Sequence, residues 1–333
     1  MTEQGHDSDL EKLRRLTASL LDAQRPAHTL RNEVLQIKSI LESSSEPISD
    51  PASDIAAGET QTKFGLAISP KMASMCLDDF ARTVQFVRGL HDAIADMRGT
   101  ITSRPVSVLY AGCGPWATLA IPVMCVVPSS EATFTLLDIH DASIASVRGL
   151  IDRLGLSAGV DALVTADASE YSIAEQPDIV VIEMMRAALD SEPQVAVAMH
   201  LVREAPNAVL IPEDVRVVLS LVDRSVRLDS EIESGDFEKT IEVGEVFVLN
   251  KSSIAAFDRF APTSIPLPDF DPDRYRPMLT TTVRAYGDHV LQGNDTGITL
   301  PKPLPLNPAP GPGEVLEFRY EIGERPGVRV KRV

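Results

Sequence analysis

The sequence is poor in cysteine, and its cysteines show no paired spacing. Only Cys76, Cys113 and Cys125 occur in 333 residues. An odd and widely spaced set excludes a disulfide framework and gives no zinc-ligand pattern. The six histidines are scattered and add no metal-binding motif. We therefore expect a cytoplasmic protein without a metal site.

Long apolar runs and an excess of positive charge are also missing. No window approaches the roughly 20 apolar residues that span a membrane, and residues 1–9 lack the apolar segment of a secretory signal. The formal net charge is −17, from 48 acidic and 31 basic residues. This balance disfavours nucleic acid and anionic membranes, which bind Lys and Arg. It is compatible with a small cationic substrate.

The apolar content of 44% supports a sizeable core, and the length allows two domains behind an N-terminal arm. Residues 1–60 form the arm and a linker. Two helices are predicted over about 8–43, broken near Pro26, with an apolar stripe that packs either on the body of the protein or on a second subunit. Its members are Leu30, Val34, Ile37 and Leu41.

Residues 61–212 alternate between helical and strand patterns, which predicts an α/β domain with a doubly wound, Rossmann-like sheet of mostly parallel strands. The pattern is helical over 62–100, with a break at Ser69-Pro70 where Ser69 would cap the next helix. Further helices are predicted over 141–154 and 193–202. The strands are predicted at 106–110, 132–137, 160–165, 178–182 and 208–211.

Residues 213–333 change to a β-rich pattern and predict an antiparallel, barrel-like domain for substrate binding or oligomerisation. Turn residues at 234–236 and 293–295 and a Pro-rich stretch at 301–313 separate the strands. These strands are predicted at 215–222, 240–249, 280–286, 290–292 and 314–320.

A glycine-containing turn, Ala111-Gly112-Cys113-Gly114, follows the first strand of the parallel sheet. Glycines there let the backbone approach a ligand closely, although the turn is neither a full GxGxxG nor a P-loop. Acidic residues end the next two strands, in Asp138-Ile139 and in Ala166-Asp167-Ala168. The first acid is placed for ribose hydroxyls and the second for an adenine edge. A nicotinamide dehydrogenase would share the first two features, whereas all three favour S-adenosylmethionine.

Two glutamates, Glu183 and Glu192, follow the apolar run 179–182 and are nine positions apart. The carboxyl ends of parallel strands are where open α/β sheets bind ligands. Two carboxylates aimed at one point can hold a planar cation, and a guanidinium fits best. The alternative is an ordinary pair of solvated acids.

Three segments resemble class I S-adenosylmethionine-dependent methyltransferases, and among them the protein arginine methyltransferase branch. Residues 76–83, Cys-Leu-Asp-Asp-Phe-Ala-Arg-Thr, resemble the family's Met-Leu-x-Asp-x-x-Arg-Thr helix. Residues 108–114 resemble its Val-Leu-Asp-x-Gly-x-Gly motif, and residues 183–192 have its double-Glu spacing. The likeness extends over about 62–333. Two departures are Tyr110 in place of the Asp and Trp116 in place of a glycine, and no Thr-His-Trp segment occurs in the C-terminal half.

The resemblance implies a role for each matched residue. Arg82 would pair with the cofactor's carboxylate, and Gly112 and Gly114 would line its path. Glu183 and Glu192 would clamp the acceptor, and Met185 would pack beside the reacting centre. Asp138 would hold the ribose, and Asp167 would lie near the adenine.

The resemblance therefore implies N-methylation of a guanidine, with free arginine or another small guanidino or amino metabolite as the acceptor. One alternative is an O- or N-methyltransferase of a non-guanidine natural-product metabolite. Another is a cofactor-binding scaffold without catalysis. We expect a small-molecule partner, no nucleic acid or membrane partner, and a possible homodimer.

Overall fold

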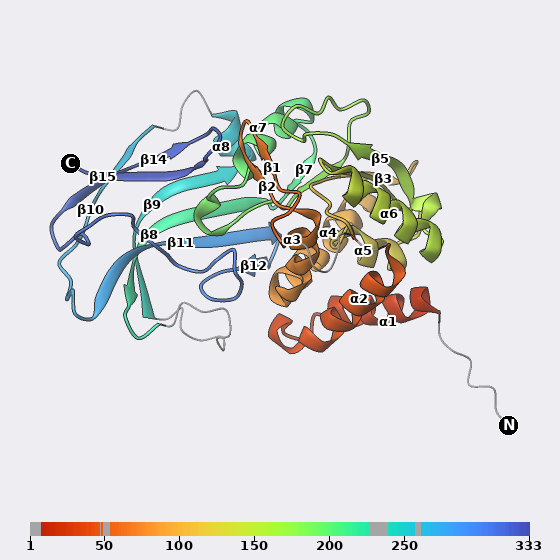
Figure 1. The fold of residues 1–333 in the computed structure, drawn as a ribbon, viewed down its shortest axis with the longest axis horizontal. Helices are drawn as coiled ribbons and strands as arrows, with labels where there is room; N and C mark the ends of the chain where they lie inside the picture. The colour runs from red at the N-terminus through yellow and green to blue at the C-terminus, as the bar shows by residue number, and fades with distance from the viewer. Residues whose placement is uncertain (1–7, 47, 49–53, 227–238, 257–260) are drawn as a thin grey trace.

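The computed structural model describes residues 8–46, 48, 54–226, 239–256 and 261–333. Figure 1 shows two parts side by side: a part with the parallel sheet and most of the helices, with α1 and α2 below it, and a β-rich part that ends at the C-terminus. No helix within the described ranges is both long and apolar enough to cross a membrane.

A five-stranded parallel sheet forms the first part, in the order β5-β4-β3-β6-β7. The strands other than the edge strand β5 are rich in buried Val, Ile and Leu, as expected where both faces of a parallel sheet are covered. The strand order reverses between β3 and β6, which are neighbours in space. The Rossmann-like parallel sheet is thus confirmed. The strands are β3 (Val106–Ala111), β4 (Ala132–Asp138), β5 (Val160–Thr165), β6 (Ile179–Ile182) and β7 (Val209–Ile211).

Helices pack against this sheet through their apolar residues. Helix α4 packs along β3, β6 and β7, whereas α6 packs along β4 and β5 and α7 along β6. Ser69 caps the short helix α3 as predicted, since its Oγ accepts a hydrogen bond from the Met72 N–H at 3.1 Å. The helices are α3 (Pro70–Met75), η2 (Cys76–Asp78), α4 (Phe80–Arg98), α5 (Ala120–Val126), α6 (Asp141–Leu154), η3 (Ser157–Gly159) and α7 (Gln194–Glu204).

The N-terminal arm packs on the body of its own chain. It comprises α1 (Asp9–Leu21), η1 (Ala27–Thr29) and α2 (Arg31–Ser44), and these helices contact α4, α5 and α6. All four residues of the predicted stripe are fully buried. The buried guanidinium of Arg88 on α4 donates hydrogen bonds to the carbonyls of Leu20, Asp22 and Arg25, at 2.6–2.8 Å. Arg88 thereby satisfies carbonyls that the end of α1 leaves without helical partners.

A β-hairpin precedes α3, where the sequence pattern predicted helix from residue 62 onward. That prediction was wrong for β1 (Thr60–Thr62) and β2 (Gly65–Ala67). The Thr62 hydroxyl accepts from the Phe64 N–H and donates to the Gly65 carbonyl, and such local bonds favour a turn over a helix. Gly65 has a φ of +140°, and a Cβ there would lie 2.8 Å from the Ser191 carbonyl oxygen. The hairpin is therefore fixed by a long-range contact.

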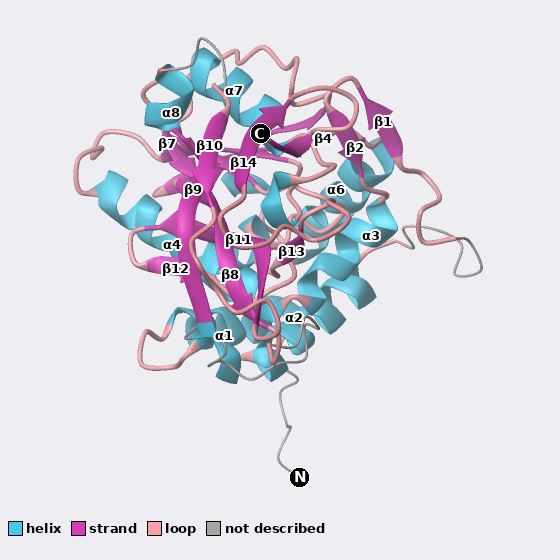
Figure 2. Ribbon diagram, turned by 90° about the vertical axis from the view of Figure 1, so that its left-hand side faces the viewer, coloured by secondary structure: helices cyan, strands magenta, loops and turns pink. Residues whose placement is uncertain are grey.

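Two antiparallel sheets form the β-rich part, and the long strands β8, β9 and β11 run beside one another in Figure 2. One sheet has the order β12-β11-β8-β9 with β13 paired to β11, and the other has the order β10-β14-β15. The rings of Phe247 and Tyr320 stack at 4.5 Å between β9 and β14. The antiparallel architecture is thus confirmed.

Five strands of this part were predicted, and α8, β10, β13 and β15 were missed because they are short or lie at sheet edges. The predicted turn at 234–236 lies outside the described residues. The elements are β8 (Asp214–Asp223), β9 (Thr240–Asn250), α8 (Lys251–Ala255), β10 (Thr263–Pro266), β11 (Tyr275–Tyr286), β12 (His289–Leu291), β13 (Lys302–Pro303), β14 (Val315–Glu321) and β15 (Gly327–Arg332).

Candidate active site

One cavity of about 350 Å³ lies beyond the carboxyl ends of β3, β4 and β6. This is the point where the strand order reverses, which is the usual ligand site of an open α/β sheet. The cavity brings together twelve of the thirteen predicted site residues, and the thirteenth, Ala111, is buried behind it in β3. The twelve are Arg82, Gly112, Cys113, Gly114, Asp138, Ile139, Ala166, Asp167, Ala168, Glu183, Met185 and Glu192.

The glycine turn presents its backbone to the cavity. Gly112 and Gly114 have φ values of +74° and +65°, in the left-handed region that side chains disfavour. The N–H groups of Gly112 and Cys113 donate to the Leu137 carbonyl at 2.8 and 3.0 Å, which ties the turn to β4. A Cβ on Gly112 would lie 2.6 Å from the end of the Met184 side chain. The end of the Met184 side chain can move, so the left-handed backbone is what favours glycine at these two positions.

Two carboxylates stand at the ends of adjacent strands. Asp138 is 7% exposed, and its two oxygens accept from the N–H groups of Gly114 and His140, each at 2.9 Å. Asp167 accepts from both the N–H and the hydroxyl of Ser169, at 2.8 and 2.7 Å. A carboxylate oxygen can accept more than one hydrogen bond. Both acids are thus held in place with capacity left for hydroxyl or amine donors.

The β1–β2 hairpin closes one side of the cavity. The Thr60 hydroxyl lies 3.2 Å from Nε2 of His140, and the Leu66 N–H donates to the Ser191 carbonyl at 2.8 Å. This wall was missed by the sequence reasoning, because the segment has no motif and was expected to be helical. The residues it contributes are Thr62, Leu66, Ala67 and Ile68.

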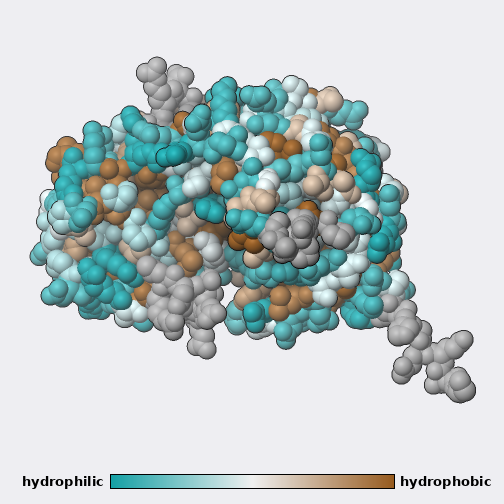
Figure 3. Space-filling view, viewed as in Figure 1, coloured by the Kyte–Doolittle hydropathy of each residue, from teal (hydrophilic) through white to brown (hydrophobic). Residues whose placement is uncertain are grey.

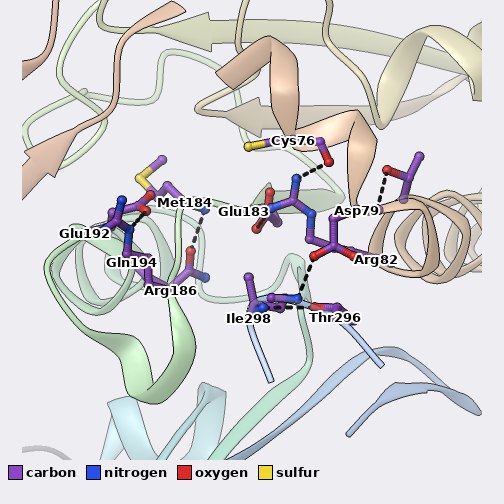
Figure 4. Close-up of polar contacts among 12 residues, drawn as sticks. Cys76, Asp79, Arg82, Glu183, Met184, Arg186, Glu192, Gln194, Thr296 and Ile298 are labelled. Carbon is purple, nitrogen blue, oxygen red and sulfur yellow. Dashed lines mark hydrogen bonds and ion pairs between the residues drawn. The ribbon is translucent and has the colours of Figure 1, made fainter. Parts of the chain in front are cut away.

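Arg82 and Glu183 form a buried ion pair at the cavity wall. Their NH1 and Oε1 atoms are 3.2 Å apart, with side chains 9% and 8% exposed. NH2 of Arg82 also donates to the Cys76 carbonyl at 2.8 Å, as Figure 4 shows. Burial raises the pKa of Glu183, and the positive charge of Arg82 partly opposes that shift. Burying both charges together avoids the large cost of burying one alone.

Glu192 lines the same cavity and is also buried, at 7% exposed. Burial, followed by the negative charge of Glu183, raises the pKa of Glu192 to about 7. Arg186 opposes this shift, and its Nε lies 3.3 Å from Oε1 of Glu192. The two glutamates thus influence each other electrostatically, which a pair splayed into bulk water would not do.

Gln194 fixes the start of the segment that carries the two glutamates. It is 1% exposed, its Oε1 accepts from the Met184 N–H, and its Nε2 donates to the Ile182 carbonyl, both at 3.0 Å. These bonds hold the backbone on either side of Glu183 (Figure 4). Gln194 was not singled out from the sequence, because an amide that bonds only to backbone has no motif.

The β-rich part holds the middle of the same segment in an unfavourable conformation. Ala188, Leu189 and Ser191 have positive φ values of 55–68°, although none is glycine. The Ala188 N–H donates to the Thr281 hydroxyl at 2.8 Å, and the Tyr320 hydroxyl donates to the Leu189 carbonyl at 2.7 Å. Such strain persists only where the surroundings enforce it, and it concentrates at functional sites.

The loop between β12 and β13 closes the cavity from the β-rich part. Gly297 and Ile298 line it, and the Gly297 N–H donates to the Asp79 carboxylate at 2.9 Å. This wall comes from a region where no motif was found. The cavity is therefore built jointly by both parts of the chain.

The two departures from the family pattern are structural in this chain. Tyr110 is buried at the cavity wall, where burial and the charge of Glu183 raise the pKa of its phenol well above its usual value. Trp116 is buried, and its indole N–H donates to the Ser45 hydroxyl at 3.0 Å, which links the glycine turn to the end of α2. Among the described residues, no group of three or more His, Cys, Asp or Glu could hold a metal ion.

The sequence matches no protein-family model and no curated protein. The structure is similar to that of protein arginine methyltransferase 10 from Arabidopsis thaliana, solved in a uniquely open conformation, with 12% identity and a TM-score of 0.53. That match covers 74% of this chain and 86% of the other. A second match is the Trypanosoma brucei PRMT1 enzyme–prozyme heterotetrameric complex with AdoHcy, with 13% identity, a TM-score of 0.49 and 74% and 85% coverage. The chain thus has the fold that the resemblance implied.

Proposed function

We propose that this chain, which shares the fold of a protein arginine methyltransferase, is an S-adenosylmethionine-dependent methyltransferase that methylates a guanidine nitrogen of a small molecule. One observation carries the proposal: the two buried glutamates line the same cavity as the glycine turn and the two strand-end aspartates. A cation site and a nucleoside site are therefore adjacent.

The residues present fit S-adenosylmethionine. Gly112 and Gly114 let its chain pass close to the backbone, Asp138 offers acceptor oxygens to ribose hydroxyls, and Asp167 offers them to the adenine amine. Arg82 would pair with its carboxylate, although in this structure the guanidinium is engaged by Glu183 and the Cys76 carbonyl. The cofactor would supply an electrophilic methyl group on a sulfonium.

The glutamates would hold and activate the acceptor. A guanidine nitrogen is a weak nucleophile because its lone pair is delocalised. Carboxylates on two of its nitrogens would concentrate positive charge there and leave electron density on the third. Met185 is 4% exposed and lines the cavity, where it would exclude water from the reacting nitrogen.

The proton released on methylation needs an acceptor with a pKa near neutrality. Glu192, with a pKa raised to about 7, is suited to accept it and then return it to water. Glu183 is instead paired with the buried Arg82, whose positive charge favours the ionised form of this carboxyl. The two acids are therefore assigned different roles by their surroundings.

The acceptor is proposed to be free arginine or a related small guanidine, in a cytoplasmic setting that suits three free cysteines. The domain boundaries at 60 and 212 and a homodimer stay predictions from the sequence. A non-guanidine acceptor and a scaffold without catalysis are the rival functions. A panel of guanidines, amines and hydroxyl compounds, assayed with labelled S-adenosylmethionine, separates all three.

Replacement of Glu183 by Gln tests the clamp. We expect Glu183→Gln to bind S-adenosylhomocysteine within a few-fold of wild type, measured by calorimetry, but to lose at least about a hundredfold in turnover of L-arginine, as expected for the loss of a buried charged contact made to the reacting group. Arg148→Ala, a change at an exposed site on α6, is the control and should leave both unchanged. Wild-type turnover in Glu183→Gln would contradict the clamp.

A further inference from the structure

Arg186 lies within the double-glutamate segment, and neither the sequence reasoning nor the proposed mechanism gives it a role. It lines the cavity, and its Nε is 3.3 Å from Oε1 of Glu192. Its side chain is 51% exposed, whereas that of Glu192 is 8% exposed. Figure 4 shows this pair on one side of the site and Arg82 with Glu183 on the other. Arg186 therefore contacts the buried carboxylate of Glu192 while about half of its own side chain is exposed to solvent.

Arg186 differs in exposure from the other arginine of the described cavity wall, whose charged residues are mostly acidic. The wall carries five acidic residues, namely Asp79, Asp138, Asp167, Glu183 and Glu192. Arg82, one of its two arginines, is buried and held by Glu183 and the Cys76 carbonyl. Arg186 is the other, and it is the one with an exposed side chain. It is thus the arginine of the described wall whose own side chain is accessible to a ligand.

An acceptor guanidinium and the Arg186 guanidinium compete for the same carboxylate. Both are planar cations with the same donor geometry, and two positive charges a few ångströms apart repel one another. Binding of the acceptor to Glu192 would therefore displace Arg186, whose long side chain stays tethered to the cavity wall. Its guanidinium would then lack a partner next to the bound molecule.

A carboxylate on the acceptor would be the matching partner for the displaced guanidinium. Arginine side chains bind carboxylates through two parallel hydrogen bonds. An acceptor with a guanidine at one end and a carboxylate at the other satisfies Glu192 and Arg186 together. An acceptor that lacks the carboxylate, or that carries a neutral amide in its place, leaves Arg186 unpaired.

We propose that Arg186 is a specificity-determining residue that selects guanidines bearing a free carboxylate over decarboxylated or amide-capped guanidines. This inference rests on the proposed function, because it takes Glu192 as part of the guanidine site. It goes further by naming the group at the opposite end of the acceptor and the residue that recognises it.

The test compares three acceptors that differ only at that end: L-arginine, agmatine and arginine amide. Wild type, Arg186→Ala and the exposed-site control Arg148→Ala are compared by kcat/KM and by calorimetric affinity in the presence of S-adenosylhomocysteine. We expect wild type and Arg148→Ala to prefer L-arginine by roughly tenfold or more, the usual worth of a charge-assisted contact. In Arg186→Ala the preference should disappear, chiefly through a higher KM for L-arginine and an unchanged or lower KM for agmatine. Arg186→Lys, which keeps the charge but not the planar fork, should retain part of the preference.

Calorimetry separates failure of this inference from failure of the proposed function, because it needs no turnover. If wild type methylates none of the three, the proposed reaction is wrong. The calorimetric affinities for the three acceptors still show whether Arg186 binds the carboxylate. Equal losses for all three acceptors in Arg186→Ala would assign Arg186 a structural role and overturn the inference. A wild-type preference for arginine amide or agmatine would overturn it as well.

Discussion

At the scale of single residues, the site depends on how each carboxylate is charged. Glu183 and Glu192 are both buried, yet their partners differ: the first is paired with the buried Arg82 and the second with the half-exposed Arg186. Sequence spacing alone presents them as equivalent. Burial raises the pKa of both, and the opposing positive charge comes from Arg82 at the first and from Arg186 at the second.

The raised pKa of Glu192 predicts a pH dependence of acceptor binding. Below the pKa of about 7 this carboxyl is protonated and neutral, so it cannot pair with a guanidinium. The affinity for L-arginine should therefore rise as the pH increases from 6 to 8, by up to about tenfold per unit below the pKa. Calorimetry in the presence of S-adenosylhomocysteine measures it. Glu192→Gln should bind weakly and show no such rise, whereas a flat wild-type profile would contradict the assignment.

The individual site residues were largely predictable, because they follow strand ends. The end of a buried apolar run marks the end of a strand. In a parallel sheet the carboxyl ends of the strands lie at one edge, so Asp138, Asp167 and Glu183 line the same cavity. The partners of these residues were not predictable. Gln194 and Arg186 act through contacts to backbone or to a residue several positions away, and neither contact leaves a pattern in the sequence.

At the scale of elements, the segment between β6 and α7 is the least regular and the most constrained part of the site. Three of its residues, Ala188, Leu189 and Ser191, have left-handed φ values although none is a glycine. Each such residue costs on the order of 1–3 kcal/mol, so the segment needs external bonds to keep this form. Those bonds come from β11, β14 and the β1–β2 hairpin.

Tyr320→Phe tests this support. The change removes one hydroxyl and leaves the Leu189 carbonyl without its 2.7 Å bond, which should lower the free energy of unfolding by about 1–2 kcal/mol. Because the segment carries Glu192, KM for the acceptor should rise while binding of S-adenosylhomocysteine changes little. Urea denaturation and steady-state kinetics measure the two effects. Unchanged KM together with unchanged stability would show that the segment keeps its form without β14.

Among the elements, the regular ones followed from the sequence and the short ones did not. The strands of the parallel sheet and helix α6 were predicted because their apolar runs and periodicity are decided locally. The β1–β2 hairpin was mistaken for helix, since its pairing depends on a contact between Gly65 and a segment more than a hundred residues away. No local pattern encodes such a contact.

At the scale of the whole molecule, the N-terminal arm packs on the body and contacts the segment that carries the glycine turn. Arg88 holds the end of α1, and Trp116 bonds to Ser45 at the end of α2, so the arm reaches the glycine turn itself. The sequence left open whether the arm packs on the body or on a second subunit. Its buried stripe shows that it packs on the body, because those residues contact the remainder of the same chain.

Arg88→Met tests how much the arm contributes. The substitution keeps about the volume of the side chain but removes the three guanidinium hydrogen bonds to the carbonyls of Leu20, Asp22 and Arg25, which should cost about 2–4 kcal/mol of unfolding free energy. Urea denaturation monitored by circular dichroism measures it, with Arg148→Met at the exposed face of α6 as the control. A loss below about 0.5 kcal/mol, or an equal loss in the control, would show that these bonds do not hold the arm.

Both parts of the chain build the cavity. The sequence predicted a β-rich part for substrate binding or oligomerisation, but it did not show which residues of that part would line the cavity. Most of the lining comes from the part with the parallel sheet, and Gly297 and Ile298 come from the β-rich part. The order of the elements predicts two parts but not how their loops meet.

A crystal structure of the wild-type protein with S-adenosylhomocysteine and L-arginine bound would locate the acceptor relative to the two glutamates. We predict that the guanidinium lies between Glu183 and Glu192, with the nucleoside over the Gly112–Gly114 turn and the acceptor's carboxylate paired with Arg186. L-arginine bound elsewhere, with the two glutamates contacting only protein groups, would contradict the account.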